Sequence, residues 1–307
     1  ITMQIPAGPG GGYDVYGRTI AQHLSRHIPG NPGFVLTYVP GAGGLKAAAE
    51  MAKRAPRDGT AMGIPLASVV VAQMIEPKNV DFNVGDFSWL GTIAELNTVI
   101  SVWHTQKART LDDAKKQTVV LGATQRGSFL FQQPTLVNAL LGTRFKLVMG
   151  YKSSADLDLA IERGEVGGRA QFWATWQSNN GQWLADRKLV HVLQVGQTRI
   201  KELPDVPSMS DLIKTERERK MVEFLYINTA MGRTLYAPPG LPAARLATLR
   251  KAIGDLTRDK EFLADMEKRK LPVNPGSGEN LEAFVRSVLA TPPDVVDELR
   301  KLLGLKG

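Results

Sequence analysis

Two glycine-rich turns, each between a short apolar run and a helical pattern, constrain the fold of this chain more than any other feature. The first follows residues 1–5 and spans residues 6–12, and the second follows residues 34–39 and is Pro40-Gly41-Ala42-Gly43-Gly44. Strands that alternate with helices predict an α/β fold with parallel strands. Both turns should therefore lie at the carboxyl edge of one sheet, where such folds bind their ligands.

Each of these turns is suited to an anion. The N–H groups of a first helical turn have no partner within the helix, and the helix dipole adds positive potential there. Gly10, Gly11 and Gly12 have no side chains, so a ligand can approach the backbone closely. The alternative is a tight turn that binds nothing, with Asp14 serving only as the N-cap of the helix that follows. Two such turns at one edge favour a binding site.

A second alternation of strands and helices predicts a second α/β lobe. The charged segment 104–116 follows an expected strand at 99–103 and suggests that the chain leaves the first lobe there. We expect one lobe from residues 1–102 with 226–307 and another from 103–225. The segment 71–89 has no clear periodicity and is expected to be irregular. Four amphipathic helices are expected near the C-terminus, beginning at Pro242, Lys260, Glu279 and Pro293.

Polar loop residues in the second lobe are also candidate ligand contacts. Thr124 and Ser128 can donate hydrogen bonds to an oxygen, and Arg126 can pair with a carboxylate through two parallel hydrogen bonds. The alternative for Arg126 is a solvated loop arginine. Trp173 and Trp176 share a face if they are helical, which favours a core role over stacking on a planar ligand.

Composition excludes several classes of function. The chain has 38 Lys and Arg against 30 Asp and Glu, a net charge of +8, but the basic residues are scattered without interleaved aromatics. Nucleic-acid binding is therefore not expected, and a mild positive field suits small anionic ligands. The absence of cysteine excludes disulfides and thiol chemistry. His23 and His27 lack a third metal ligand nearby, so a solvated helix face is expected for them.

The glycine turn after a first strand also suggests a dinucleotide-dependent enzyme. The Gly-x-Gly-x-x-Gly pattern is absent, however, because Val15 stands where its third glycine would be. No acidic residue follows the second strand to bind a ribose. Few histidines occur, and none lies beside a plausible serine nucleophile. An enzyme is therefore the weaker alternative, and no cofactor is expected.

The segments PAGPGGGYD at 6–14 and VPGAGGLKAAAEMAKRAPRDGTAMG at 39–63 resemble the substrate receptors of tripartite tricarboxylate transporters, the Bug family. That family has a Pro-x(3)-Gly-Gly-x-x-Asp loop, a Pro-Gly-Ala-Gly-Gly loop and an Ala-x-Pro-Asp-Gly-type turn in its first lobe. Further similar segments are Gly127-Ser128, Gly150-Tyr151-Lys152, residues 203–207 and residues 237–242. The resemblance thus runs nearly from end to end.

The resemblance implies a two-lobed, type II periplasmic-binding-protein-like fold of the Venus-flytrap kind, each lobe a mostly parallel sheet flanked by helices. It implies a monomeric, periplasmic receptor that is not an enzyme and is not inserted in a membrane. Such a receptor holds a small mono- or dicarboxylate between its lobes and delivers it to membrane transporter subunits. A ligand-presenting co-receptor for a membrane sensor kinase is the alternative. A chain that starts without a leader is what a trimmed export signal or a shortened chain would each give.

The resemblance also implies the ligand-binding residues. Arg126 or Arg169 would contact a second carboxylate, although Arg169 could equally be structural at the end of a strand. Tyr38-Val39, where many relatives have Asn-Arg, and Ser153-Ser154, in place of glycines, depart from the family pattern. The full expected set is Gly8, Pro9, Gly10, Gly11, Gly12, Tyr13, Asp14, Pro40, Gly41, Ala42, Gly43, Gly44, Thr124, Arg126, Gly127, Ser128, Tyr151 and Arg169.

Overall fold

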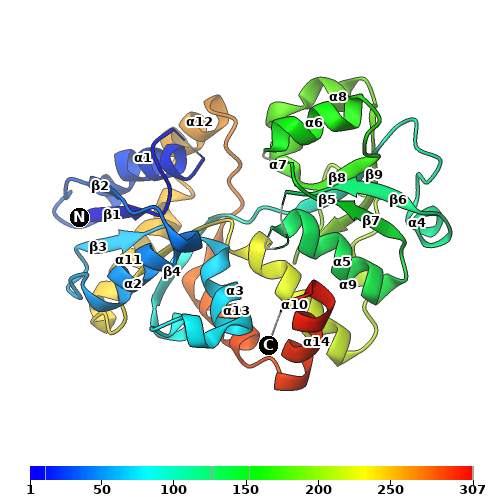
Figure 1. Ribbon diagram of the computed structural model, residues 1–307. Helices are drawn as coiled ribbons and strands as arrows, with labels where there is room; N and C mark the ends of the chain where they lie inside the picture. The colour runs from blue at the N-terminus through cyan, green and yellow to red at the C-terminus, as the bar shows by residue number, and fades with distance from the viewer. Residues whose placement is uncertain (11, 125, 127, 152, 306–307) are drawn as a thin grey trace. The chain divides into compact units, whose positions relative to one another are not determined.

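The chain folds into two α/β units, as the computed structural model in Figure 1 shows. The structure describes residues 1–10, 12–124, 126, 128–151 and 153–305. Unit 1 consists of Ile1–Leu96 and Ala230–Ala290, and unit 2 consists of Asn97–Thr229 and the residues from Thr291 onward. None of the helices within the described residues is long and apolar enough to cross a membrane.

Unit 1 is built on a six-stranded mixed sheet with the order β11-β4-β10-β3-β1-β2. Strand β1 pairs in parallel with β2 and β3, whereas β10 and β11 add antiparallel pairing on the other side. The strands are β1 (Thr2–Ile5), β2 (Val35–Tyr38), β3 (Ala61–Gly63), β4 (Ser88–Ala94), β10 (Arg233–Ala237) and β11 (Gly276–Ser277).

Helices cover this sheet and supply much of its core. Met3 and Ile5 of β1 and Ile20 of the first helix are fully buried, so the apolar stripe of that helix packs on the sheet. The helices are α1 (Gly12–Leu24), α2 (Leu45–Lys53), α3 (Ala67–Ile75), α11 (Ala243–Leu256), α12 (Lys260–Lys268) and α13 (Gly278–Leu289). Short 3₁₀ turns occur at Ser25–His27, Ala42–Gly44, Pro77–Asn79 and Val84–Asp86.

The expectation of irregular structure over residues 71–89 is wrong at both ends. Helix α3 continues to Ile75, and β4 begins at Ser88. All seven residues of β4 are buried, so the strand has no alternation of polar and apolar residues that would reveal it. Helix α3 is likewise apolar on most of its surface, which hides its period.

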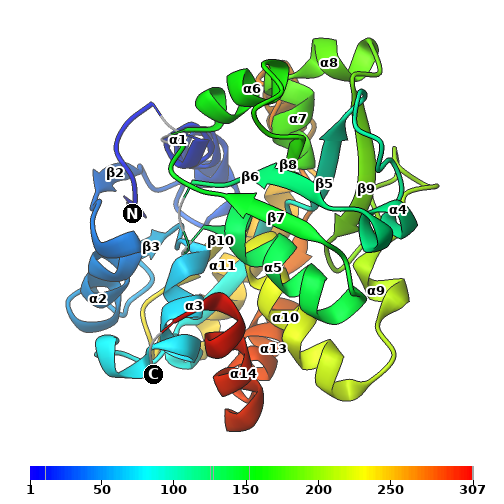
Figure 2. The same cartoon turned by 45° about the vertical axis from the view of Figure 1, so that its right-hand side comes forward.

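Unit 2 is built on a five-stranded mixed sheet with the order β7-β6-β8-β5-β9 (Figure 2). Strand β6 pairs in parallel with β7 and β8, and β5 pairs antiparallel with β8 and β9. The strands are β5 (Thr98–Trp103), β6 (Val119–Gly122), β7 (Phe145–Val148), β8 (Gly168–Phe172) and β9 (Leu189–Val195). The helices are α4 (Leu111–Lys116), α5 (Phe129–Leu141), α6 (Ser154–Glu162), α7 (Trp173–Asn179), α8 (Gly181–Ala185), α9 (Met209–Leu212), α10 (Glu216–Ala230) and α14 (Pro293–Leu303).

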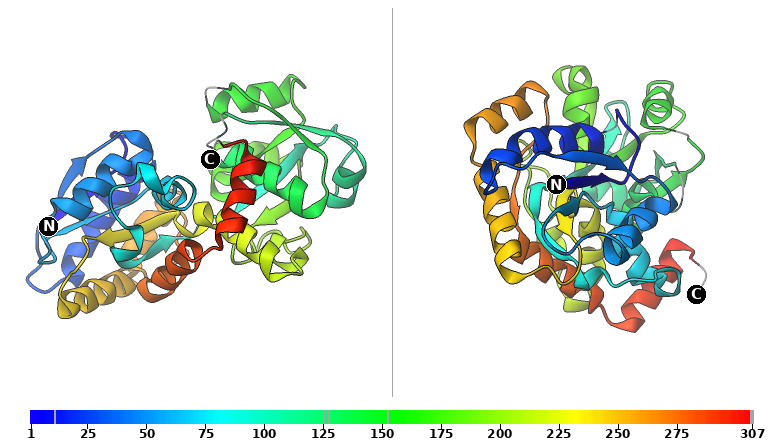
Figure 3. Two further views of the ribbon diagram at one scale, coloured as in Figure 1. Left: turned by 60° about the horizontal axis from the view of Figure 1, so that its bottom comes forward. Right: turned by 90° about the vertical axis from the view of Figure 1, so that its left-hand side faces the viewer.

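The expected α/β architecture is confirmed, and the division of the chain differs from the expected one in three places. Residues 226–229, at the end of α10, belong to unit 2 and not to the first lobe. Strand β5 belongs to the sheet of unit 2, not to the first lobe. Helix α14, the red helix in Figure 3, also belongs to unit 2, where it contacts α5. Its Asp294 and Glu298 pair with Arg217 of α10. Each sheet combines a parallel part, built by the strand–turn–helix segments, with antiparallel pairing through β10 and β11 in unit 1 and through β5 in unit 2. The sheets are therefore mixed and not mostly parallel as expected.

Candidate functional site

The two glycine loops of unit 1 lie at one edge of its sheet, as the sequence predicts. Strands β1 and β2 are parallel neighbours, and their last residues, Ile5 and Tyr38, are partners in the register. The loops that follow them therefore leave the sheet side by side at its carboxyl edge. The exposed members of these loops are Gly8, Pro9, Gly10, Gly12, Pro40, Gly41, Ala42 and Gly43, while Gly44 is buried and Gly11 lies outside the described residues.

Asp14 organises the first of these loops. Helix α1 begins at Gly12, so Asp14 lies within the first turn and is not the N-cap that the sequence predicts. Its buried carboxylate accepts the N–H of Gly10 at 2.7 Å and the Nε–H of Arg18 at 2.8 Å. Burial opposes ionisation of Asp14, but the hydrogen bonds from Gly10, Tyr38 and Arg18 outweigh it and lower its pKa. Gly10 therefore gives its N–H to Asp14, which fixes the loop immediately before α1.

The second loop has an unusual backbone. Gly41, Ala42, Gly43 and Gly44 all have positive φ, and the value of 46° at Ala42 is uncommon for a residue with a side chain. Ser68 fixes the turn by donating its hydroxyl to the carbonyl of Gly43 at 2.6 Å. A loop held in such a conformation presents its backbone in one fixed arrangement, and it leads directly into the N-terminus of α2.

The edge of unit 1 can hold an anion through backbone donors and helix dipoles. The first-turn N–H groups of a helix lack partners within that helix. At the second loop, the N–H groups of Gly44 and Leu45 already donate to the carbonyls of Gly41 and Ala42, so the later N–H groups of the first turn of α2 are the candidate donors. No group of three or more histidine, cysteine or carboxylate side chains suited to a metal ion occurs in the part of the chain that the structure describes. His23 and His27 do not form the expected solvated face, because they contact Asp265 at 3.2 Å and Asp259 at 2.8 Å, near α12.

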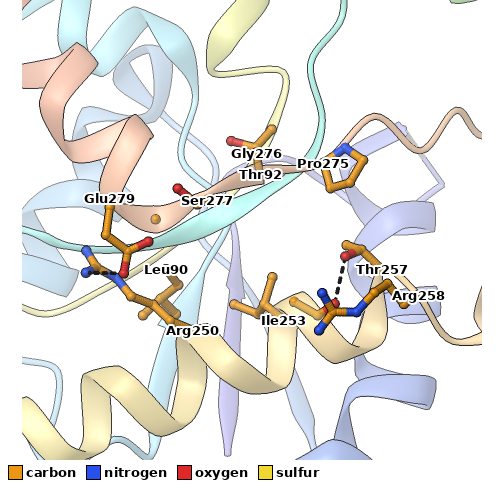
Figure 4. A pocket seen from close by; sticks show the side chains of 12 residues that line it. Leu90, Thr92, Arg250, Ile253, Thr257, Arg258, Pro275, Gly276, Ser277 and Glu279 are labelled. Atoms are coloured by element: carbon orange, nitrogen blue, oxygen red, sulfur yellow. Dashed lines mark hydrogen bonds and ion pairs between the residues drawn. The ribbon is translucent and has the colours of Figure 1, made fainter.

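A separate pocket of unit 1 has a volume of about 190 Å³ and is lined by residues of β4, α11 and the start of α13 (Figure 4). Its Arg250 is neutralised by Glu279 at 3.0 Å and by Glu282 at 2.7 Å. None of the ligand-binding residues expected from the sequence lines it. Because the charge of Arg250 is compensated by these two carboxylates, it does not attract an anion to this pocket.

In unit 2, the loop between β6 and α5 corresponds to the predicted Thr124–Ser128 segment. The half-buried Thr124 accepts the N–H of Gly150 at 3.0 Å through its carbonyl, which joins two loops of this unit. Ser128 is the N-cap residue of α5, and its carbonyl accepts the N–H of Phe131 at 3.0 Å. Gly127, expected between them, lies outside the described residues.

The side chain of Arg126 is exposed, which is expected both for a ligand contact and for a solvated loop arginine. Its guanidinium lies 5.7 Å from the ring centroid of Phe131. It also lies against Gly304, where a Cβ atom would be 2.2 Å from Nη1. Gly304 ends α14, and a cation at a helix C-terminus is favoured by the helix dipole. Within unit 2, Arg126 thus contacts Phe131 and the end of α14, and a structural role explains both contacts.

Arg169 is fully buried and paired with Asp158, as expected for the structural interpretation of this residue. Its Nη2 and Nε donate to Asp158 at 2.6 and 3.0 Å, and its guanidinium lies 4.4 Å from the centroid of the Trp176 ring. Trp176 is also fully buried, which confirms the core role expected for it. The half-buried Tyr151 and Trp173 pack against the same apolar cluster, and burial raises the pKa of Tyr151.

The sequence did not reveal one residue at the edge of unit 1. Arg233 is the first residue of β10, and its guanidinium lies 4.2 Å from the ring centroid of Tyr13 and 5.0 Å from that of Tyr16. In the sequence, Arg233 is visible only as a single arginine immediately before the strand residues Thr234–Ala237. Nothing in its spacing connects it to a helix that begins about 220 residues earlier.

Comparison with known proteins gives a sequence relative that matches most of the chain. The chain is 28% identical over 266 residues to the UPF0065 protein in the TAR-I ttuE-ttuC' intergenic region of Agrobacterium vitis. This match covers 84% of the chain and 71% of the relative. No protein-family model matches the sequence.

Solved structures with a similar fold cover nearly the whole chain. A TctC solute binding protein from Polaromonas has a TM-score of 0.78 at 18% identity and covers 99% of this chain and 97% of its own. The periplasmic binding protein BugD has a TM-score of 0.63 at 20% identity, with 100% and 98% covered. Rpa4515 of R. palustris, solved with adipate, has a TM-score of 0.65 at 19% identity, with 99% and 97% covered.

The sequence relative and the fold agree with the loop motifs. The long match to a UPF0065 protein covers most of the chain, and the two mixed sheets have the arrangement found in the TctC and BugD structures. The chain is thus a homologue of this UPF0065 protein at 28% identity and has the fold of the TctC and BugD periplasmic binding proteins.

Proposed function

We propose that this protein is a periplasmic solute receptor that binds a small mono- or dicarboxylate and delivers it to a tripartite tricarboxylate-type membrane transporter. The observation that carries the proposal is the pair of exposed glycine loops at the carboxyl edge of the unit 1 sheet. Both loops lead into helix N-termini, and register places them side by side. Backbone donors and helix dipoles at such an edge favour a carboxylate.

The internal bonding of the loops supports a preformed site. Asp14 holds Gly10 in place, and Ser68 holds Gly43, so both backbones are fixed before a ligand arrives. A ligand then binds without a large cost for ordering the loops. The adipate in the similar Rpa4515 structure supports a carboxylate as the ligand of this fold.

A thermal-shift screen tests the carboxylate. The protein is melted with mono- and dicarboxylates of increasing length and with their amides as uncharged controls. A ligand that binds only the native state stabilises it by about 2.7 kcal/mol at a concentration 100 times its Kd. We expect at least one carboxylate to raise the melting temperature while its amide does not. A panel without any carboxylate-specific shift would contradict the proposal.

Two glycine substitutions test the place of binding. Gly41→Val disturbs the second loop, because φ at Gly41 is 133° and a side chain there is strained. Gly30→Val is the matched control, since φ at Gly30 is also positive, at 85°, but the residue precedes β2 at the opposite end of that strand. We expect Gly41→Val to abolish the carboxylate shift and Gly30→Val to retain it. Equal shifts in both variants would show that the second loop does not bind the ligand.

Delivery to a transporter is tested separately in cells. Deletion of the receptor should abolish uptake of the radiolabelled ligand, and the wild-type chain, but not Gly41→Val, should restore it. A strain that retains full uptake without the receptor, while losing a transcriptional response to the ligand, would instead support presentation to a sensor kinase.

A further inference from the structure

Arg233 enters the sheet of unit 1 at the same edge as the glycine loops. Strand β10 runs antiparallel to β3, and Tyr236 is the partner of Gly63, the last residue of β3. Arg233 precedes Tyr236 by three residues, so it lies beyond the carboxyl end of β3. A register shift between Arg233 and Thr234 marks an irregularity of the kind that redirects a side chain.

Aromatic rings of the first turns of α1 hold this side chain in place. The guanidinium packs on Tyr13 and Tyr16, and its Nη1 donates to the carbonyl of Gly232 at 2.6 Å. Its Nη2 lies 3.0 Å from the position that a Cβ of Gly12 would take. The arginine thus reaches the beginning of α1, and the lack of a side chain at Gly12 makes room for it.

Among the residues that the structure describes, Arg233 differs from the other shielded arginines in having no carboxylate partner. Three other arginines within the described residues are not exposed, and each pairs with a carboxylate: Arg169 with Asp158, Arg250 with Glu279, and Arg300 with Asp297. No such pair involves Arg233 within the described part of the chain, and its buried Nε has no hydrogen-bond partner there. A partly desolvated cation without a counter-charge is costly.

The dipole of α1 adds to the uncompensated positive charge of Arg233. The N-terminus of α1 already carries positive potential from its dipole, so a cation at its first turn is placed where an anion is favoured. Asp14, the acidic residue of that turn, is engaged by Arg18 and by Gly10. Two positive features therefore meet at the β1–α1 loop, and their combined potential favours a negatively charged ligand.

We propose that Arg233 is the cation that selects a carboxylate at the β1–α1 loop of unit 1. This proposal rests on the proposed carboxylate-receptor function and adds a specificity-determining residue to it. The two tyrosine rings restrict the guanidinium before binding, which lowers the entropic cost of contact with the ligand. A charged fork beside the N-terminus of α1 favours a carboxylate over a neutral amide of the same shape.

Calorimetric titration of the folded protein tests this role. For wild-type protein and for Arg233→Gln, Kd is measured for the carboxylate that the thermal screen identifies and for its amide. Hydrogen bonds to charged groups contribute enough that losing one predicts about 10- to 100-fold weaker carboxylate binding. We expect amide binding to change little, so the preference for the carboxylate falls by that factor. Arg57→Gln, an exposed arginine of unit 1, is the control of equal charge change and should keep the wild-type preference.

Each outcome decides the proposal. An unchanged ratio of the two Kd values in Arg233→Gln would overturn it, even if the ligand-free variant melts at a lower temperature. Should Arg233→Gln not fold, Arg233→Met keeps the apolar stem against the tyrosine rings and is measured in the same way. If wild-type protein itself binds no carboxylate, the proposed function fails; if wild type binds and the variants bind equally, only the role of Arg233 fails.

Discussion

Tyr38, the last residue of β2, donates its hydroxyl to Asp14 of α1 at 2.5 Å. This bond connects the strand before the second glycine loop to the first turn after the first loop. Arg18 completes the arrangement by donating to Tyr38 at 2.6 Å and to Asp14 at 2.8 Å. The two loops are thus braced against each other by side chains, in addition to the pairing of their strands.

Loss of the Asp14 charge should destabilise unit 1. The carboxylate accepts three hydrogen bonds, and Asp14→Asn weakens all of them, so we expect a loss of about 1–3 kcal/mol in the free energy of unfolding. Urea denaturation of the two proteins at pH 7 measures it. Asp112→Asn is the control, because Asp112 forms an exposed pair with Lys115 and should change stability by less than about 0.5 kcal/mol.

The same substitution should change the acid dependence of stability. Because the folded-state pKa of Asp14 is lowered, its contribution is complete above the unfolded-state pKa of about 3.9 and is lost as the pH falls through the folded-state value. We expect the stability difference between wild type and Asp14→Asn to shrink below about pH 4. A difference that stays constant down to pH 2 would show that the Asp14 charge does not stabilise the fold.

Asp14 and Tyr38 should be energetically coupled. Tyr38→Phe removes the hydroxyl that bridges Asp14 and Arg18, and we expect it to cost about 1 kcal/mol. In a double-mutant cycle with Asp14→Asn, the two effects should fall short of additivity by about 0.5 kcal/mol or more. Additive effects would mean that the bond does not connect the two loops in solution.

Removal of Asp158 should be among the most damaging single changes in unit 2. Asp158→Ala leaves the fully buried guanidinium of Arg169 without its counter-charge, which predicts a loss of about 3–5 kcal/mol. Asp186→Ala breaks only exposed contacts, an ion pair with Lys188 and a hydrogen bond from Gln182, and serves as control. Denaturation monitored by tryptophan fluorescence compares them. A loss below about 1 kcal/mol for Asp158→Ala would contradict the buried pair.

His191 should make unit 2 sensitive to mild acid. Burial lowers the pKa of His191 to about 4, and its Nδ1 lies 2.9 Å from the hydroxyl of Ser101. The unfolded chain binds this proton near pH 6.5 and the folded chain only near 4, so stability should fall as the pH decreases between these values. NMR titration should place the midpoint of His191 well below 6, and His191→Gln should flatten the pH dependence in that range. A midpoint near 6.5 would contradict the burial.

The sequence predicted that both glycine loops leave the unit 1 sheet at one edge, because that feature is local. A strand, a glycine turn and a helix start within about 15 residues determine which edge of the sheet the turn occupies. Arg169 shows the limit of this reasoning, since the same arginine at a strand end can face solvent, a ligand or a buried Asp158. Only the packing around Trp176 distinguishes these possibilities.

The sequence could not predict which segments that are far apart along the chain pack against each other. Helix α14 has a clear apolar stripe, and such a stripe fits either core. Its placement in unit 2 depends on the contact with α5 and on the pairing with Arg217. Arg233 was missed for the same reason, because its partners Tyr13 and Tyr16 are brought to it by the sheet order and not by spacing along the chain.

The most direct test of the central claim is a calorimetric titration of the wild-type protein. The titrants are the carboxylate with the largest thermal shift and its amide, each at two salt concentrations. We predict saturable one-to-one binding of the carboxylate, weaker at the higher salt concentration, and at least tenfold weaker binding of the amide. Equal binding of both compounds, or binding of neither, would contradict a carboxylate receptor.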